Sequence, residues 1–389
     1  RVRSSAASDV YKRQGKQGMV CMGLLLVLSS CHTGKQITAS GLQRKDFQTE
    51  VNGQHTDLFT LSNKQGMEVC ITNYGARVVS ILVPDRNGKR EDVVCGFSTI
   101  TEYMEQRQNF GSTVGRYIGR ILNARFTLDG VEYKLVPNNG KSGHISHGGN
   151  PGFADRIWKV EQADTHRVRL SYLSPDGENG FPGNLKVTLV YSLGEDDNAL
   201  DLTYEATTDA PTVLNLSHHS FFNISGNFTK SVEDQQLWVD ADRFTPYDDK
   251  KCVTGEYLPV AGTPLDFRMP HAIGECIDAD HPQLKVVNGY DHTWELNTKG
   301  DDTRPAAWVY DPASGRKMEI FTTEPGMQIY TGNGLKGKMT GKGRIAYPFR
   351  SAVCFETMHF QDSPNQPGFP STVLRPGEVF RSHTVYKFE

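Results

Sequence analysis

Ala199-Leu-Asp-Leu-Thr-Tyr-Glu-Ala-Thr207 alternates apolar and polar side chains along its whole length. The apolar face of this segment consists of Leu200, Leu202, Tyr204 and Ala206. Successive side chains of a β-strand point to opposite faces, so the alternation predicts a strand with one buried face and one polar face. Of all segments in the chain, this one shows the clearest alternation.

Similar short segments follow one another along the rest of the chain. Turn-forming residues separate them, since the chain contains 38 Gly and 19 Pro. The other predicted strands are Glu68–Tyr74, Arg77–Pro84, Ala124–Leu128, Val168–Leu173, Lys186–Leu193, Met318–Thr323 and, at the end of the chain, His383–Phe388. No long stretch shows sustained helical periodicity, and no internal repeat is visible. The sequence therefore predicts an all-β protein, a large antiparallel β-sandwich with few short helices.

Size and composition are consistent with one large domain. The chain has 389 residues, of which 37% are hydrophobic and 10% aromatic, enough to build a large core. All-β sandwiches run to about 250 residues or more as one domain, so residues 47–389 are expected to form a single domain. The formal net charge of −3 gives no electrostatic case for a nucleic-acid partner.

The segment Asn215-Leu-Ser-His-His-Ser-Phe-Phe-Asn223 is a predicted strand with unusual polarity. His219 shares one face with Asn, Ser and Phe, while His218 lies on the other, more apolar face. A strand with this distribution lines a polar cleft more naturally than it sits in the middle of a core. Because the unperturbed pKa of histidine suits proton transfer near neutral pH, His219 is a candidate acid or base. The alternative is a structural histidine.

Two carboxylates in or beside other predicted strands can also be either functional or structural. Glu356, within Ala352-Val-Cys-Phe-Glu-Thr-Met-His-Phe360, shares its face with apolar side chains, which should raise its pKa and suit it to a general base. Asp291 precedes an apparent strand and stands close to Trp294. The structural alternatives are an ion pair for Glu356 and a turn or cap residue for Asp291.

The histidine pairs have spacings that resemble those of metal ligands. On strands, however, His144 and His147 point to opposite faces, as do His218 and His219, so neither pair chelates without a turn. No metal site is therefore predicted. Five cysteines outside the leader are interpreted as buried small hydrophobic residues, with one or two disulfides as the alternative in an exported protein. They are Cys70, Cys95, Cys252, Cys276 and Cys354.

The first 31 residues have the features of an export leader. Lys12, Arg13 and Lys16 precede the apolar run Met19–Leu28, which is too short to span a bilayer comfortably. Leu28-Ser-Ser-Cys31 then fits a bacterial lipoprotein cleavage box, in which Cys31 carries the lipid. The alternative is an ordinary secretory signal followed by an incidental Cys.

This leader gives an expected location. Residues 32–46 would form a polar tether, and the protein would be exported and held on a bacterial membrane only through its N-terminal lipid, on the periplasmic or outer side. Arg1–Gln14 contains no Met and is unlike the start of a signal peptide, so one interpretation is an artefact of gene calling.

Seven motifs occur in one order along the chain. They are Gly115-Arg-Tyr-Ile-Gly-Arg-Ile121, Ser146-His-Gly-Gly149, Asn215-Leu-Ser-His-His-Ser-Phe-Phe-Asn223, Gly289-Tyr-Asp-His292, Gln328-Ile-Tyr-Thr-Gly-Asn333, Glu356-Thr-Met-His-Phe-Gln-Asp-Ser-Pro-Asn365 and Leu374-Arg-Pro-Gly-Glu378. Each is weak alone, but together and in this order they resemble the aldose 1-epimerase (galactose mutarotase) family. The resemblance covers nearly the whole chain after the leader and implies the supersandwich fold of that family.

The resemblance implies the interconversion of α and β anomers of hexoses such as glucose or galactose. This reaction needs a base at the C1 hydroxyl and an acid at the ring oxygen, on opposite sides of the O5–C1 unit, and no cofactor. By resemblance Glu356 is the base, His219 is the acid and His147 assists near O5 and C1. The implied hydrogen-bonding lining consists of Asp291, Arg120 and Gln328. Family members usually have Asn before the Arg, whereas this chain has Gly119, which puts substrate preference in doubt.

Other functions remain open from the sequence. A glycoside hydrolase would use two carboxylates, and Asp291 with Glu356 fits that description, but it leaves His219 without a necessary role. A catalytically inactive sugar-binding lipoprotein is the other alternative. The preferred aldose and the choice between monomer and homodimer are not given by the sequence.

Overall fold

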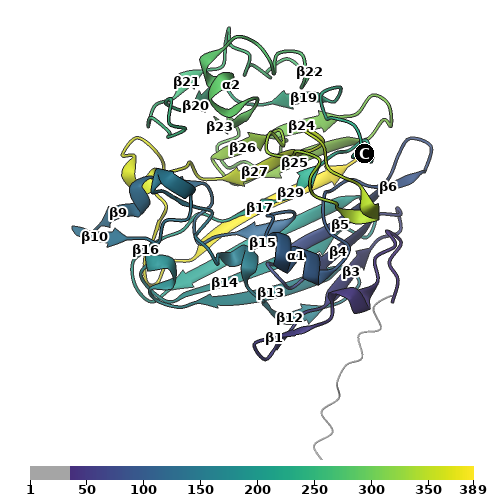
Figure 1. Ribbon diagram of the computed structural model, residues 1–389, viewed down its shortest axis with the longest axis horizontal. Coiled ribbons are helices and arrows are strands. Elements are labelled where there is room, and N and C mark those ends of the chain that lie inside the picture. The colour runs from purple at the N-terminus through teal and green to yellow at the C-terminus, as the bar shows by residue number, and fades with distance from the viewer. Residues whose placement is uncertain (1–35) are drawn as a thin grey trace, which may run out of the picture. The chain divides into compact units, whose positions relative to one another are not determined.

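Antiparallel strands are the main regular structure of residues 36–389, the part of the chain that the computed structural model describes (Figure 1). These residues belong to one compact unit, Gly34–Glu389. Its largest sheet has nine strands in the order β12 (Lys159–Ala163), β13 (Arg167–Ser174), β14 (Leu185–Leu193), β15 (Ala199–Thr208), β29 (Phe380–Phe388), β25 (Lys317–Thr322), β24 (Ala307–Tyr310), β19 (Gln236–Val239) and β22 (His271–Ala272). The C-terminal strand β29 thus lies in the middle of this sheet, paired with β15 on one side and β25 on the other.

A six-stranded sheet packs against the nine-stranded one. Its strands, in order, are β18 (Phe221–Phe222), β27 (Val353–Met358), β26 (Gly326–Tyr330), β23 (Asp291–Glu295), β20 (Arg243–Thr245) and β21 (Leu258–Pro259). Phe355 and Trp294 of this sheet join Leu189 and Leu202 of the larger sheet in one apolar core. The Tyr386 hydroxyl on β29 also donates a hydrogen bond to the Phe355 carbonyl at 3.0 Å, which ties the two layers together.

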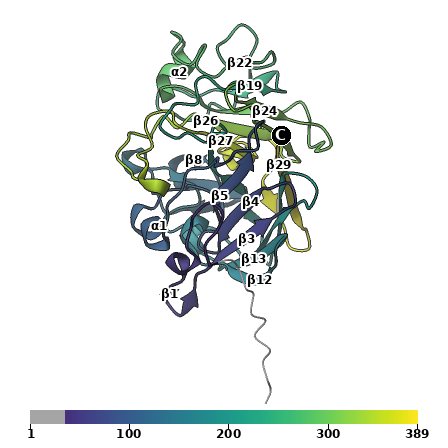
Figure 2. The same ribbon diagram turned by 90° about the vertical axis from the view of Figure 1, so that its right-hand side faces the viewer.

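A four-stranded sheet, visible in front in Figure 2, completes the core. Its strands are β3 (Leu58–Ser62), β4 (Glu68–Thr72), β5 (Arg77–Pro84) and β6 (Arg90–Asp92). The short strand pairs are β1 (Glu50–Val51) with β2 (Gln54–His55), β7 (Ser112–Val114) with β17 (Ser217–His219), β8 (Arg120–Ile121) with β11 (Ile145–Ser146), β9 (Arg125–Leu128) with β10 (Val131–Lys134), and β16 (Thr212–Val213) with β28 (Val373–Leu374). All these pairs are antiparallel, so the predicted fold class is confirmed.

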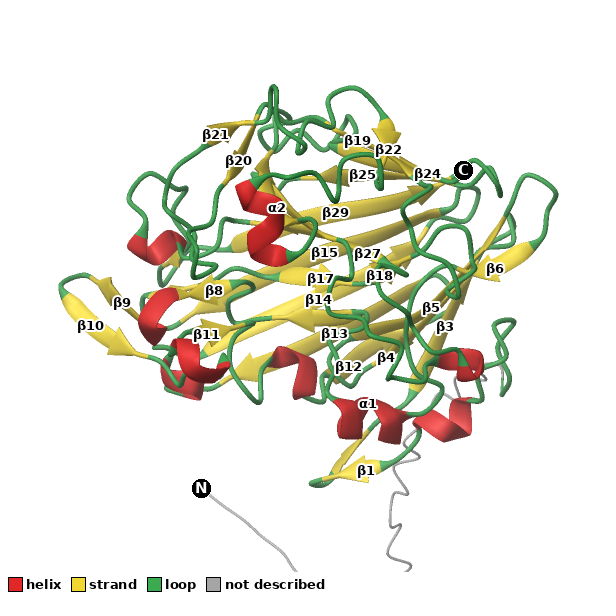
Figure 3. Cartoon of the chain, turned by 45° about the horizontal axis from the view of Figure 1, so that its top comes forward, coloured by secondary structure: helices red, strands yellow, loops and turns green. Residues whose placement is uncertain are grey.

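Helices are short and lie around the strands rather than between them (Figure 3). The α-helices are α1 (Ile100–Gln106) and α2 (Pro282–Val287). Short 3-10 turns occur at Arg44–Phe47, Leu122–Ala124, Gly140–Ser142, Phe153–Asp155, Glu178–Gly180, Lys342–Arg344 and Ser363–Asn365. Over residues 36–389, no helix has both the length and the apolar character needed to cross a membrane.

Most strand predictions agree with the structure, but the predicted strand Asn215–Asn223 is divided into β17 and β18, which belong to different sheets. Arg77–Pro84 is a strand with the predicted bounds, and the alternating segment from Ala199 extends to Thr208. The five described cysteines are free thiols, and of these Cys70, Cys95 and Cys354 are buried. The leader and Cys31 lie outside the described residues.

The compact unit includes residues before Phe47. The described part of the expected tether, residues 36–46, folds onto the domain, because Leu42 is buried beside Phe47 and the Ala39 amide donates to the Glu68 carboxylate. This segment is polar in composition, but its apolar residue Leu42 packs into the domain. Residues 36–46 therefore belong to the same compact unit as residues 47–389.

Candidate functional site

A cavity of about 240 Å³ opens on the face of the six-stranded sheet that is turned away from the nine-stranded sheet. Its volume is below the range of about 300–1,000 Å³ that drug-sized ligands occupy, so it suits a single sugar ring better than a long chain. The lining residues are Gln108, Asn109, Gly119, Arg120, Ser146, His147, His219, Phe221, Asp291, Gln328, Tyr330, Glu356, Met358 and Gln361. Most of them carry a hydrogen-bonding side chain.

Strand alternation places the floor of this cavity. On β27, Phe355 points into the core while Glu356 points the other way. Gln328 on β26 pairs directly with Glu356 and, on its other side, with Thr293 on β23. Cross-strand neighbours share a face, so these polar side chains form one row across three strands.

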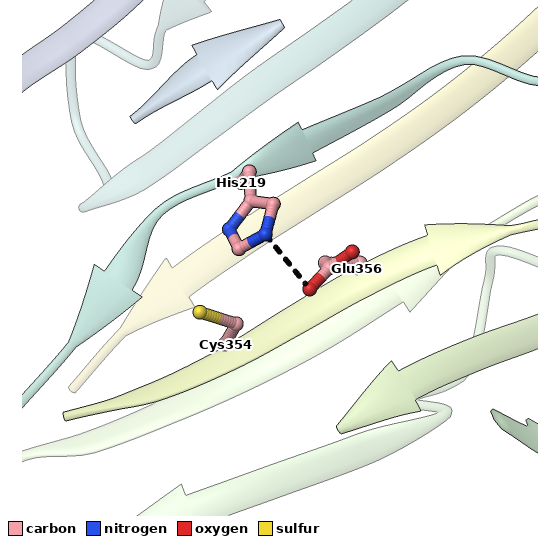
Figure 4. Close-up of side chains that lie close together, drawn as sticks. All are labelled: His219, Cys354 and Glu356. Carbon is pink, nitrogen blue, oxygen red and sulfur yellow. Dashed lines mark ion pairs between the residues drawn. The ribbon is translucent and has the colours of Figure 1, made fainter. Parts of the chain in front are cut away.

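His219 reaches the same floor from β17. Its Nε2 lies 3.3 Å from Oε1 of Glu356, and both side chains are almost fully buried (Figure 4). The His219 ring stacks on Phe221 with centroids 5.0 Å apart, which fixes its plane. Its Nδ1 is buried and has no hydrogen-bond partner within residues 36–389. The imidazole thus contacts Glu356 through Nε2, while its Nδ1 has no partner among the described residues.

The buried position changes the protonation of both groups. Burial raises the pKa of the Glu356 carboxyl well above its usual range, and the neighbouring Asp291 adds to this effect. Burial also lowers the pKa of His219 well below its usual range, and nearby His147 contributes. The surroundings therefore favour a neutral pair, in which one proton lies on Glu356 and His219 is uncharged.

His147 forms a second imidazole wall beside His219. It follows β11 in a left-handed conformation with φ 52°, and its ring meets that of His219 edge to face at 5.5 Å. The Gly119 amide donates to His147 Nδ1 at 3.4 Å, so the neutral ring carries its proton on Nε2. Burial, with Arg120 adding to it, lowers the pKa of His147 to about 4. His147 is therefore a neutral hydrogen-bonding group at pH 7.

One wall of the cavity carries charged and amide side chains, those of Asp291, Arg120 and Gln328. The Gln328 amide donates to the Asp291 carboxylate at 2.7 Å. Burial raises the pKa of Asp291, while Arg120 and Gln328 oppose that shift. Arg120 begins β8, next to the strand that leads to His147, so the pairing of β8 with β11 brings both side chains to the same opening.

Comparisons with known proteins agree with this site. A family model described as "Aldose 1-epimerase" matches residues 57–387. The chain belongs to the aldose 1-epimerase family. It is 40% identical over 331 residues to the galactose mutarotase of Bos taurus, covering 85% of this chain and 93% of that protein. It is 36% identical to the aldose 1-epimerase of Escherichia coli K12, covering 87% and 96%.

Solved structures agree as well. The aldose epimerase homologue from C. elegans superposes with a TM-score of 0.79 at 30% identity, covering 86% of this chain and 99% of that one. The described part of this family member thus has the galactose mutarotase fold that the motifs implied. As a member of the aldose 1-epimerase family, the chain is an isomerase.

The structure of this aldose 1-epimerase family member brings the predicted site residues together. All six line the cavity: Glu356, His219, His147, Asp291, Arg120 and Gln328. Two histidines singled out with them lie elsewhere. His218 points to the core, where its Nε2 lies 2.6 Å from the Ser220 hydroxyl, and His144 accepts a hydrogen bond from the Asn123 amide. One expectation needs refinement, because the acid and base candidates contact each other instead of facing each other from opposite sides.

A different set of side chains in the described residues has the composition of a metal site. The ligand atoms of His219, Cys354 and Glu356 lie within 4.8 Å of one another, and Figure 4 shows the Cys354 sulfur beside the pair. Burial raises the pKa of both Cys354 and Glu356 well above their usual values. Metals bind the deprotonated thiol and carboxylate, so this environment opposes metal binding.

Several lining residues were not singled out from the sequence. Tyr330 and Met358 each lie two positions beyond a predicted site residue on the same strand, and Phe221 lies two positions beyond His219 within the predicted strand Asn215–Asn223, so alternation alone would have found them. Gln361 follows the end of β27, in a motif quoted for the resemblance, while Gln108 and Asn109 come from a loop after α1. Loop residues carry no periodic signal, and their arrival at the cavity depends on the fold.

Proposed function

We propose that this aldose 1-epimerase family member interconverts the α and β anomers of a hexose such as glucose or galactose, with Glu356 and His219 as the proton-transfer pair. The observation that carries the proposal is the 3.3 Å contact between His219 Nε2 and Glu356 Oε1 on the floor of a cavity of single-sugar size. O5 and the C1 hydroxyl are bonded to the same carbon. Two adjacent groups can therefore each reach one of these oxygens.

Ring opening uses the charged form of the pair. The Glu356 carboxylate takes the proton of the C1 hydroxyl, the C1–O5 bond breaks as the C1 carbonyl forms, and the His219 imidazolium protonates O5. Rotation about C1–C2 then presents the other face of the aldehyde. Closure reverses every proton transfer and returns the pair to its starting charges, so the reaction consumes nothing.

The buried environment supports the ring-opening step. The pair holds one proton throughout, and opening converts carboxylate and imidazolium into carboxylic acid and neutral imidazole. Burial favours these neutral forms, as the raised pKa of Glu356 and the lowered pKa of His219 indicate. Before opening, one proton must pass from Glu356 to His219, and their contact provides the path.

The surrounding residues position the sugar. The neutral His147 ring lies beside His219 and is assigned to the region of O5 and C1. Asp291, Gln328 and Arg120 are assigned to the sugar hydroxyls, because their carboxylate, amide and guanidinium groups face the same cavity. Carboxylates and amides discriminate hydroxyl arrangements through hydrogen bonds that a wrong isomer leaves unmade.

Polarimetry tests the proposal. Freshly dissolved α-glucose, α-galactose and α-xylose should each lose rotation faster in the presence of the purified protein than in buffer, and the relative rates give the preferred aldose. Binding of these sugars without acceleration would support the inactive sugar-binding alternative. Release of sugar from an aryl glycoside would support the hydrolase alternative, which no comparison favours.

From the sequence alone, we also propose that Leu28-Ser-Ser-Cys31 is a lipoprotein cleavage site and that the mature protein is anchored to a membrane through Cys31. Each buried CH₂ of an acyl chain contributes about 0.8 kcal/mol, and more than one chain makes anchoring stable. Cells fed a radioactive fatty acid should label the wild-type protein but not the Cys31→Ser variant. An unlabelled wild-type protein would favour a plain secretory signal.

A further inference from the structure

Gly119 leaves room in the cavity wall for another residue. It has φ +75°, and a Cβ added there would stand only 2.6 Å from Cγ of Gln361 and 3.1 Å from its Cδ. No real pair of carbon atoms approaches so closely, so any larger residue at position 119 must displace Gln361. In this chain the Gln361 side chain takes up the space that a side chain at position 119 would need.

The Gln361 carboxamide is tied into the wall that it fills. The side chain is only 4% exposed, and its Nε2 donates to the Tyr247 hydroxyl at 2.6 Å and to Oε1 of Gln328 at 3.3 Å. Its Oε1 accepts from the backbone amide of Arg120 at 3.3 Å. Gln361 therefore connects the strand that begins with Arg120 to the floor of the cavity.

These contacts form a chain with a defined direction. At one end the backbone N–H of Arg120 can only donate, and at the other an ionised Asp291 can only accept. Gln328 gives its Nε2 to Asp291, so its Oε1 must accept, and it does so from Gln361 and from the Thr293 hydroxyl at 2.5 Å. The two ends together fix which way both amides face.

We infer that Gln361 is a positioning residue for hydroxyl recognition, and that Gly119 is required because Gln361 occupies the space of its missing side chain. Gln361 holds the Gln328 amide with Nε2 toward Asp291, and through it sets the hydrogen-bonding pattern that the sugar meets. The inference rests on the proposed function, because it concerns the same cavity. It predicts that positions 119 and 361 are energetically coupled.

A double-mutant cycle tests this coupling. The variants are Gln361→Ala, Gly119→Asn and the double variant, assayed by polarimetry with α-galactose and α-glucose. Gln361→Ala should raise KM roughly 3- to 10-fold with a smaller change in kcat, since the buried Gln328 Oε1 loses one of its two donors and keeps only the Thr293 hydroxyl. Gly119→Asn should do comparable damage by displacing Gln361, although Asn itself tolerates a positive φ. The double variant should be less impaired than the product of the two single effects, because Asn then has room.

Two controls separate shape from polarity. Gln361→Glu keeps the length, but its ionised carboxylate presents only acceptors to Gln328 and should be at least as harmful as Gln361→Ala. Asn109→Ala, which changes a cavity residue away from this wall, should combine with Gly119→Asn by simple multiplication. A merely structural role for Gln361 would leave KM and the galactose-to-glucose rate ratio unchanged while lowering the melting temperature.

The outcomes distinguish this inference from the proposed function. An active wild-type protein whose single effects multiply in the double variant would overturn the coupling and leave the function standing. An inactive wild-type protein would overturn the proposed function. In that case the same cycle, measured as galactose affinity by calorimetric titration, still decides whether the two positions are coupled.

Discussion

Buried polar side chains have many hydrogen-bond partners at two arginines of the core and few at the catalytic pair on the cavity floor. Arg116 is 2% exposed, yet its guanidinium donates to the carbonyls of Pro182 and Gly183 and to the Ser174 hydroxyl. Arg316 is equally buried and donates to four backbone carbonyls. Each guanidinium therefore uses most of its N–H donors in hydrogen bonds that tie loops to a sheet.

The His219–Glu356 pair on the cavity floor is as deeply buried but has fewer hydrogen-bond partners. His219 keeps a ring nitrogen without a partner among the described residues, and Glu356 meets another titratable group instead of a set of fixed donors. Buried polar groups in stable regions are normally paired, and exceptions concentrate at functional sites. The difference indicates that the buried arginines contribute to the stability of the fold, whereas His219 and Glu356 do not.

The largest expected effect tests the catalytic half of this comparison. Glu356→Gln and His219→Gln should each lower kcat by about 100-fold or more, since each removes one proton-transfer group. Circular dichroism should show that both variants are folded, and polarimetry gives kcat. His144→Gln, which changes a histidine outside the cavity, should keep a rate near that of the wild type. A folded Glu356→Gln variant with the wild-type rate would exclude the proposed mechanism.

The structural half is tested at Arg116. Arg116→Met leaves several buried acceptors without donors, and the free energy of unfolding should fall by about 3 kcal/mol or more. The folded fraction should keep its kcat, because Arg116 does not line the cavity. Arg381→Met serves as the control: its side chain is 67% exposed beside Glu205, so the change should stay within about 0.5 kcal/mol. Denaturant titration measures both, and equal losses would contradict the contrast.

A smaller effect has a defined dependence on pH. The folded state binds the Glu356 proton more tightly than the unfolded chain does, because the pKa of Glu356 is raised above its model-compound value of 4.5. The free energy of unfolding therefore falls as pH rises above that value. Glu356→Gln removes this penalty, so it should be more stable than the wild type by about 1 kcal/mol or more at pH 8, with a smaller gain at pH 5.

Thermal unfolding at the two pH values checks this prediction. Glu161→Gln is a suitable control, because Glu161 lies on the edge strand β12 and its side chain is exposed to solvent. Its effect should not grow with pH as that of Glu356→Gln does. If Glu356→Gln were destabilising at pH 8, the carboxylate would be contributing to stability, and the contrast with the arginines would fail.

The smallest expected effect is none. Activity should survive dialysis against a strong chelator, because the proposed proton transfers need only Glu356 and His219. Polarimetry before and after dialysis measures this. Activity that is lost and then restored by zinc would assign a metal to His219, Cys354 and Glu356.

Much of the fold could be predicted because its signals are local. The alternation from Ala199 to Thr207 reports one buried face, and that face is the one that enters the core. His218 and His219 were separated correctly by the same period. The six site residues needed the family motifs in addition, since alternation shows that Glu356 is unusual but not which residues it meets.

The remainder depends on long-range packing. No local pattern shows that β29 pairs with both β15 and β25, or that residues near Leu42 pack against the four-stranded sheet. Gln361 was quoted only as part of a motif, and its role in filling the space at Gly119 follows from the close approach of two distant loops. The contact between His219 and Glu356 likewise results from the meeting of β17 with β27.

The central position of β29 has a consequence for how the chain is made. Strands β12–β15 and strands β19, β22, β24 and β25 belong to one sheet only because β29 (Phe380–Phe388), which is synthesised after all of them, lies between the two groups. Until β29 has been synthesised, β15 and β25 both present open edges, which are prone to wrong pairing. The nine-stranded sheet can therefore be completed only once Phe380–Phe388 is available, and a chain that lacks this strand would have the sheet in two separate halves.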